Sequence, residues 1–98
     1  MTRRVLLVGL RDVVVDDALA QLGIPDLGAV SCTNLDDVRA ALGASPVAAV
    51  VIGAGLDLEV RLEIVREVFT RTDSTTVHLK DRASGPAGFL PFARSVLT

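Results

Sequence analysis

Short apolar runs recur along this chain, and their lengths are those of β-strands. RVLLVGL holds an unbroken apolar stretch from Val5 to Leu10, and VAAVVIG at residues 47–53 is apolar throughout. Continuous runs of β-branched and aliphatic residues are typical of strands that a parallel sheet buries on both faces. GAVSCT at residues 28–33 predicts a shorter strand. The run at 47–53 is therefore predicted to be central in a sheet.

The fourth run, STTVHLK, has a different pattern. Val77 and Leu79 alternate with Thr76, His78 and Lys80, so one face of this strand is polar. A half-polar strand fits the edge of a sheet better than its centre. An exposed edge can pair with another chain. Thr76 and His78 are therefore predicted as candidate interface residues.

Between the runs, apolar residues recur at helical spacing, and polar residues or glycines mark the helix ends. Asp12 is predicted to be the N-cap of a first helix that stops at Gly23, where the glycine precedes an apolar residue and a proline. Asn34 is predicted to cap a second helix, with Asp37 three residues on, a spacing similar to that of the capping box. The predicted buried positions of these two helices are Val15, Ala18, Leu19, Leu22, Leu35, Val38, Ala41 and Leu42.

Two further helices follow the third and fourth runs. One is predicted from about Asp57 to Arg71, and the other from near Gly88, because Pro91 is tolerated only in a first helical turn. The predicted buried face of the third helix consists of Leu58, Leu62, Val65 and Phe69. The predicted ion pairs on its other face are Asp57/Arg61, Glu63/Arg66 and Glu67/Arg71.

Four strand–helix units in succession predict an α/β fold, in one domain over residues 1–98. Such alternation gives a parallel sheet with right-handed crossovers and helices on both faces. We expect a three-layer, doubly wound sheet with strand order 2-1-3-4, which is taken from the flavodoxin-like fold. In that order the second and third helices lie on one face, and the last helix must join the first on the other. Residues 81–88 are predicted to make this crossing.

Composition and charge narrow the classes of partner. Hydrophobic residues make up 50% of the 98 residues and the mean hydropathy is +0.50, as expected for a sheet covered on both faces. Only 3% of residues are aromatic, the net charge is −2 and the pI is near 5.2, which argues against nucleic acid and anionic membranes as partners. The apolar stretch after the two N-terminal arginines is too short for an export signal or a membrane span. One cysteine excludes an internal disulfide and predicts a cytoplasmic location.

In its layout the chain resembles the receiver domains of response regulators over about its first four-fifths. The resemblance lies in RRVLLVGLRD, in AVSCTNLDDVRAAL, and in the third strand followed by an amphipathic helix. Receivers have an acidic pair after the first strand, where this chain has Gly9 and Leu10. They have a phosphorylated Asp at the end of the third strand, where it has residues 53–55, GAG.

The remaining receiver positions also differ. Receivers have a Ser or Thr at the end of the fourth strand and a Lys after a fifth, whereas Lys80 follows the fourth strand here. The acidic pocket of receivers binds the Mg²⁺ that makes phosphotransfer to Asp possible. The resemblance therefore implies a degenerate relative that is not phosphorylated on Asp and is used for binding or assembly.

Residue types that could do chemistry are not grouped in the sequence. The acidic pairs at 16–17 and 36–37 fall in first helical turns, where carboxylates favour the helix dipole and face water, and His78 is the only histidine. Cys32 has no Cys-His-Asn spacing around it and is expected to be a buried strand residue. Ser84 lacks the Gly-x-Ser-x-Gly context and is expected in a turn. We therefore predict no catalytic residues, metal site or cofactor.

The loops after the strands are the candidate ligand site, because open α/β sheets bind ligands at the carboxyl ends of their strands. A Lys and two Arg beside helix N-termini would suit a phosphate or carboxylate. The candidate ligand-binding residues are Gly9, Arg11, Gly53, Gly55, Lys80, Arg82 and Ser84. The alternative is structural: the glycines make tight turns, the Lys80 stem runs along the sheet edge, and Asp81 and Arg82 are solvated.

Three functions remain open. The first is a non-catalytic module that acts by self-association or by docking to a protein partner, because no catalytic cluster is visible and the fourth strand is a predicted free edge. The second is binding of a small anionic ligand, such as a nucleotide, at the strand ends. The third, an enzyme, would need convergent acid–base or nucleophilic partners, which the sequence does not display.

Overall fold

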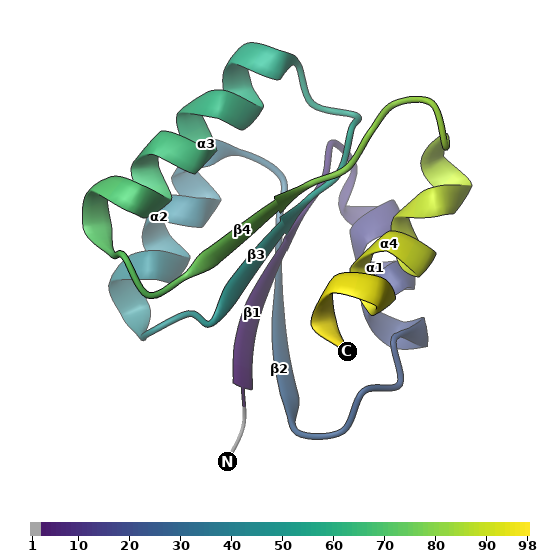
Figure 1. The fold of residues 1–98 in the computed structure, drawn as a ribbon, viewed down its shortest axis with the longest axis horizontal. Helices are drawn as coiled ribbons and strands as arrows, with labels where there is room; N and C mark the ends of the chain where they lie inside the picture. The colour runs from purple at the N-terminus through teal and green to yellow at the C-terminus, as the bar shows by residue number, and fades with distance from the viewer. Residues whose placement is uncertain (1–2) are drawn as a thin grey trace.

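Four parallel strands form one sheet in the order β2-β1-β3-β4 in the computed structural model, which describes residues 3–98 (Figure 1). The elements are β1 (Arg3–Val8), α1 (Asp12–Gln21), β2 (Leu27–Cys32), α2 (Leu35–Ala44), β3 (Ala49–Ile52), α3 (Leu58–Arg71), β4 (Thr76–Leu79), a 3₁₀ turn (Pro86–Gly88) and α4 (Phe89–Leu97). The predicted three-layer α/β class, the strand order and the edge position of β4 are all confirmed.

Two apolar cores lie on the two faces of the sheet, since successive residues of a strand point to opposite sides. Leu6 and Val8 of β1 pack with residues of α2 and α3, whereas Val5 and Leu7 pack with residues of α1 and α4. Figure 1 shows α2 and α3 on one side of the strands and α1 and α4 on the other. The predicted crossing of residues 81–88 is confirmed, and it gives the second face its second helix.

The predicted helix ends are largely confirmed. Asn34 caps α2, with its Oδ1 accepting from the Asp37 N–H at 2.8 Å, and Gly23 has a left-handed φ of 61°. Asp12 is not the N-cap predicted: Arg11 holds that position. The Asp12 carboxylate instead accepts from the Val13 N–H at 2.8 Å, inside the first turn. The helix begins one residue earlier than predicted because Arg11 already has the extended cap conformation.

The predicted buried face of α3 is wrong for three of its four residues. Leu58, Leu62 and Phe69 are about half exposed, whereas Val65 is partly buried against the core. The buried residues of the helix are Arg61, Ile64 and Val68. The helix has two apolar stripes, and it is rotated so that the second one contacts the sheet. The Arg61 guanidinium donates to the carbonyl of Lys80 at 3.3 Å, so its buried side chain caps the end of β4 rather than pairing with Asp57.

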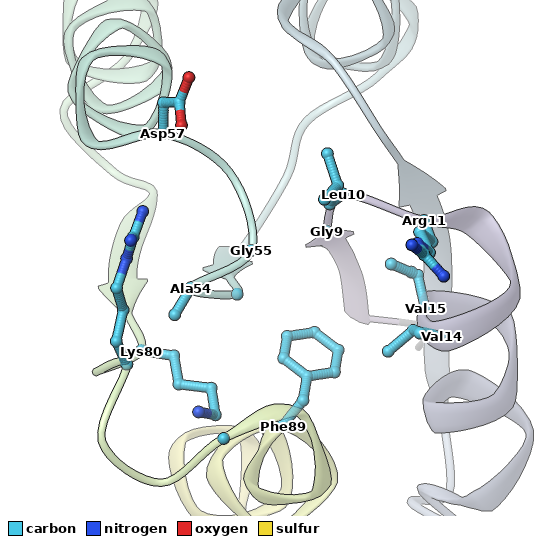
Figure 2. Close-up of a pocket in the computed structure, with 13 residues that line it drawn as sticks. Gly9, Leu10, Arg11, Val14, Val15, Ala54, Gly55, Asp57, Lys80 and Phe89 are labelled. Atoms are coloured by element: carbon cyan, nitrogen blue, oxygen red, sulfur yellow. The ribbon is translucent and has the colours of Figure 1, made fainter.

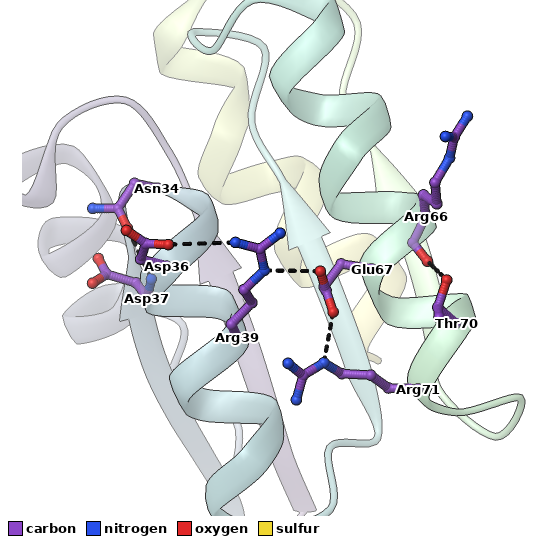
Figure 3. Close-up of polar contacts among 8 residues, drawn as sticks. All are labelled: Asn34, Asp36, Asp37, Arg39, Arg66, Glu67, Thr70 and Arg71. Carbon is purple, nitrogen blue, oxygen red and sulfur yellow. Dashed lines mark hydrogen bonds and ion pairs between the residues drawn. The ribbon is translucent and has the colours of Figure 1, made fainter.

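Charged residues join α2 to α3 along the side that the two helices share (Figure 3). Glu67 accepts from Arg71 on its own helix at 2.7 Å and from Arg39 of α2 at 2.9 Å. These hydrogen bonds, first that of Arg71 and then that of Arg39, lower the pKa of Glu67. Among residues 3–98, Glu67/Arg71 is the one predicted α3 ion pair that forms.

The last helix is tied to the beginning of the chain. Arg94 of α4 donates to the carbonyl of Gln21 at the end of α1 at 2.6 Å, and Arg3 of β1 donates to the carbonyl of Leu97. Phe89, Ala93 and Leu97 of α4 are buried against the second face of the sheet. The packing of α4 therefore depends on β1 and α1, which come from the beginning of the sequence.

Candidate functional site

A pocket of about 780 Å³ opens at the carboxyl ends of β1, β3 and β4. Its walls come from residues 9–11 after β1, 53–57 after β3 and 80–85 after β4, together with the first turns of α1 and α4. Figure 2 shows Asp57 and Lys80 on one side of the opening, Leu10 and Val14 on the other, and Phe89 between them. A volume of this size is in the range of sites for small ligands.

The structure brings most of the predicted ligand-binding residues to this one pocket. Its lining includes Gly9, Arg11, Gly53, Gly55, Lys80 and Arg82. The carboxyl ends of parallel strands meet at one edge of a sheet, which is why loops far apart in the sequence converge there. Ser84 does not line the pocket but contacts Lys80, which does.

Lys80 does not run along the sheet edge as the structural alternative predicted. Its side chain turns inward, and the residue is only 3% exposed. Nζ donates to Ser84 Oγ at 2.7 Å and to the carbonyl of Asp81 at 2.9 Å. A buried ammonium needs such acceptors, because burial without them would be costly. One of its three N–H donors remains for a further acceptor.

Asp81 and Ser84 complete a small polar cluster around this lysine. Ser84 Oγ donates to Asp81 Oδ1 at 2.6 Å, and Asp81 Oδ1 lies 3.9 Å from Lys80 Nζ. The pKa of Asp81 is lowered, mainly by the Ser84 hydrogen bond and also by the charge of Lys80. The cluster folds the loop after β4 back over Lys80 and holds the ammonium at the pocket wall.

The lining is basic at its polar positions and apolar elsewhere. Arg11 and Arg82 are exposed, as predicted for Arg82, and with Lys80 they face one acidic lining residue, Asp57. The apolar part of the lining comes from Leu10, Val14, Val15, Ala54 and Phe89. This combination suits a molecule with a negative group and an apolar body.

The predicted glycines of the pocket, Gly9, Gly53 and Gly55, are not left-handed. Gly85, a lining residue that was not predicted, has a left-handed φ of 68°. A Cβ on Gly53 would lie 3.3 Å from the Phe89 ring, and one on Gly55 would lie 3.1 Å from Leu10. The residues after β3 form a turn at 54–55, as the tight-turn alternative expects, and Gly53 and Gly55 also make room for neighbouring side chains.

The apolar lining residues were missed by the sequence analysis. Leu10 read as the end of a buried strand, although β1 ends at Val8 and Leu10 is exposed. Phe89 is buried in the core and also lines the pocket. Leu10 and Val14 lie on either side of the predicted start of the first helix, next to the end of a strand. This position was the signal in the sequence that they could line a site at the strand ends.

The other candidate residues lie elsewhere. Cys32 is buried in β2, and burial, with a smaller effect of Asp37, raises the pKa of its thiol to about 11. Thr76 and His78 lie on the edge strand β4, where His78 Nε2 and Thr76 Oγ1 are 3.1 Å apart. Within residues 3–98, no three His, Cys, Asp or Glu side chains are grouped as a metal site would require.

Comparisons with protein-family models, curated proteins and solved structures found no match. The resemblance to receiver domains therefore stays a prediction from the sequence pattern. None of the helices in residues 3–98 has the length and apolar character needed to cross a membrane.

Proposed function

We propose that this protein is a non-catalytic module that binds a small anion with an apolar body in the strand-end pocket. The observation that supports the proposal is the convergence of Arg11, Lys80 and Arg82 on a cavity that is otherwise largely apolar. Three of the four charged lining residues are basic, and Asp57 is the acidic one. Asp81 lies 3.9 Å from Lys80 Nζ, so Arg11 and Arg82 contribute most of the charge that attracts an anion, although the whole chain is acidic.

The two arginines are placed to hold the anion from different loops. Arg11 follows β1 and Arg82 follows β4, with the β3 loop between them. Guanidinium groups bind carboxylates and phosphates with paired hydrogen bonds, and Lys80 can add a donor from the pocket wall. Leu10, Val14 and Phe89 would contact the apolar part of the ligand. Nucleotides and phosphorylated or carboxylated metabolites belong to this class.

Several features support binding without catalysis. Acid–base and nucleophilic catalysis need groups that reach a substrate with the right protonation state. Lys80, Asp81 and Ser84 instead hydrogen-bond to one another, and this fixes the loop. Cys32 lies buried on β2 and is not among the residues that line the pocket.

A thermal-shift panel of nucleotides, phosphorylated metabolites and apolar carboxylates tests the proposal, with calorimetric titration of any hit. A ligand at 100 times its dissociation constant stabilises a protein by about 2.7 kcal/mol, which raises the midpoint of a small domain by about 11–22 °C. Arg11→Gln with Arg82→Gln is expected to weaken binding at least tenfold, because both stems remain while both charges are lost.

Arg66→Gln is the matched control, since this exposed arginine of α3 is not part of the pocket. Its binding constant should equal that of the unchanged protein. A panel without any hit would refute the proposal, and so would a hit whose affinity survives the double substitution.

A further inference from the structure

An exposed apolar stripe follows the outer side of α3. Leu58, Leu62 and Phe69 are 52%, 46% and 53% exposed, and their spacing puts them on one face of the helix. The side of α3 that faces α2 is occupied by Glu67 and Arg71. The stripe lies on the opposite side of the helix from Glu67 and Arg71, because a helix turns about 100° per residue. It therefore points away from α2, toward the β4 edge of the sheet. Contiguous exposed apolar residues of this kind mark interaction surfaces.

The edge of β4 extends this surface. Leu79 is 40% exposed and pairs in register with Ile52, whose side chain packs on the α2–α3 face. Leu79 thus lies on the same side of the sheet as α3. We call Leu58, Leu62, Phe69 and Leu79, with the outer backbone of Thr76–Leu79, the α3–β4 surface.

Backbone N–H and C=O groups on the outer side of β4 are available for hydrogen bonds. The N–H groups of Thr76 and Lys80 donate inward, to the carbonyls of Ala48 and Ile52. Alternate residues of a strand turn these groups to opposite sides, so those of Val77 and Leu79 face outward. Within residues 3–98 the sheet has four strands, and β4 has a strand on its inner side alone. Figure 1 looks onto this edge between α3 and α4.

We propose that the α3–β4 surface binds a second copy of this chain through a two-fold axis perpendicular to the sheet. The two β4 strands would then pair antiparallel, with Val77 opposite the partner's Leu79, and the two sheets would become one. The same axis brings the α3 stripe of each chain against that of the other. A two-fold interface needs a patch that is complementary to itself, and this patch meets that requirement.

The charges around the stripe favour this arrangement. Glu59 and Glu63 lie in the first half of α3, whereas Arg66 lies in its second half. Antiparallel packing places the acidic half of each helix beside the basic half of the other, and a parallel arrangement would oppose like charges. The residues of β4 itself, Thr76–Leu79, include no Asp, Glu, Lys or Arg, so two copies of the strand meet without repulsion between such charges.

Sedimentation velocity over a hundredfold range of concentration, reaching about 0.1 mM, tests the proposal. The unchanged protein is expected to dimerise, and Leu62→Glu is expected to raise the dimer dissociation constant at least tenfold. Val13→Glu is the matched control, because Val13 is 65% exposed on α1, outside the surface, and should leave dimerisation unchanged. Circular dichroism verifies that each variant is folded. An unchanged protein that stays monomeric, or a Leu62→Glu protein that dimerises as before, would overturn the proposal.

Two further measurements test the geometry. Amide hydrogen exchange at Val77 and Leu79 should be slower in the dimer than in monomeric Leu62→Glu, because only the dimer gives these groups partners. Glu59→Arg should weaken the dimer, and adding Arg66→Glu should restore it by exchanging the two charges. Exchange that is equally fast in both proteins overturns the strand pairing, and a double variant that remains weak overturns the antiparallel helices. None of these residues lines the pocket, so failure here is distinct from failure of anion binding.

Discussion

Ile64→Ala and Leu62→Ala, two residues apart on α3, are expected to have very different effects on the free energy of unfolding. Ile64 is fully buried and Leu62 is 46% exposed. Replacing Ile64 by Ala removes three buried carbons, which account for about 2.4 kcal/mol at about 0.8 kcal/mol each, and the remaining cavity raises the loss to about 3–4 kcal/mol. Leu62→Ala should lower stability by about 1 kcal/mol or less, since water already reaches its site and no closed cavity forms.

Urea unfolding followed by circular dichroism measures both values, at a protein concentration where sedimentation finds the monomer. A domain of this size has a total stability of about 5–15 kcal/mol, so Ile64→Ala should be visible as a large fall in the midpoint. Helix propensity does not explain the contrast, because it differs among these residues by only a few tenths of a kcal/mol. Equal losses for the two variants, or a larger loss for Leu62→Ala, would refute the rotation of α3 described above.

Three other substitutions and measurements test separate contacts. Gly9→Ala should lower the free energy of unfolding by about 1–3 kcal/mol, because its Cβ would lie 2.7 Å from buried Val15, and a urea midpoint that does not fall would contradict this. Cys32, whose thiol has a pKa raised to about 11, should react with a thiol reagent at pH 8 far more slowly in the folded protein than in urea, and equal rates would be inconsistent with its burial. Glu67→Gln should destabilise at neutral pH, and its difference from the unchanged protein in urea unfolding should shrink as the pH falls below about 4.3, through the lowered pKa of Glu67. A difference that is the same at pH 7 and pH 3 would contradict the ion-pair account.

The fold could be predicted because the local patterns agree with one another. Apolar runs such as Val50–Ile52 have no polar interruption, and turn residues such as Gly23 separate them from the helices. The face of α3 could not be predicted in the same way. Spacing alone favours the stripe of Leu58 and Leu62, although Ile64 and Val68 form a second apolar stripe beside Arg61. The choice depends on where α2 lies and on a buried arginine, and neither is visible in helical periodicity.

The place of the candidate site could also be predicted, because it follows from the direction of the strands. The role of Lys80 could not. Its inward turn depends on the loop that folds over it, where Ser84 accepts from its ammonium and Gly88 passes close by. A Cβ on Gly88 would lie 2.9 Å from Ser84 and 3.3 Å from Lys80, so this packing requires a glycine. Contacts within a loop of this kind leave no periodic trace in the sequence.

The position of α4 has a consequence for the synthesis of the protein on the ribosome. Residues 89–97 cover part of the face formed by Val5, Leu7 and Val51, and all four strands of the sheet are made before them. Until the last helix has left the ribosome, this side of the nascent sheet is covered by α1 alone. Exposed apolar surface at this stage is prone to aggregation and is bound by chaperones. Nascent chains stalled before Phe89 should therefore remain protease-sensitive and associated with chaperones, and chains extended beyond Leu97 should be released in a folded state.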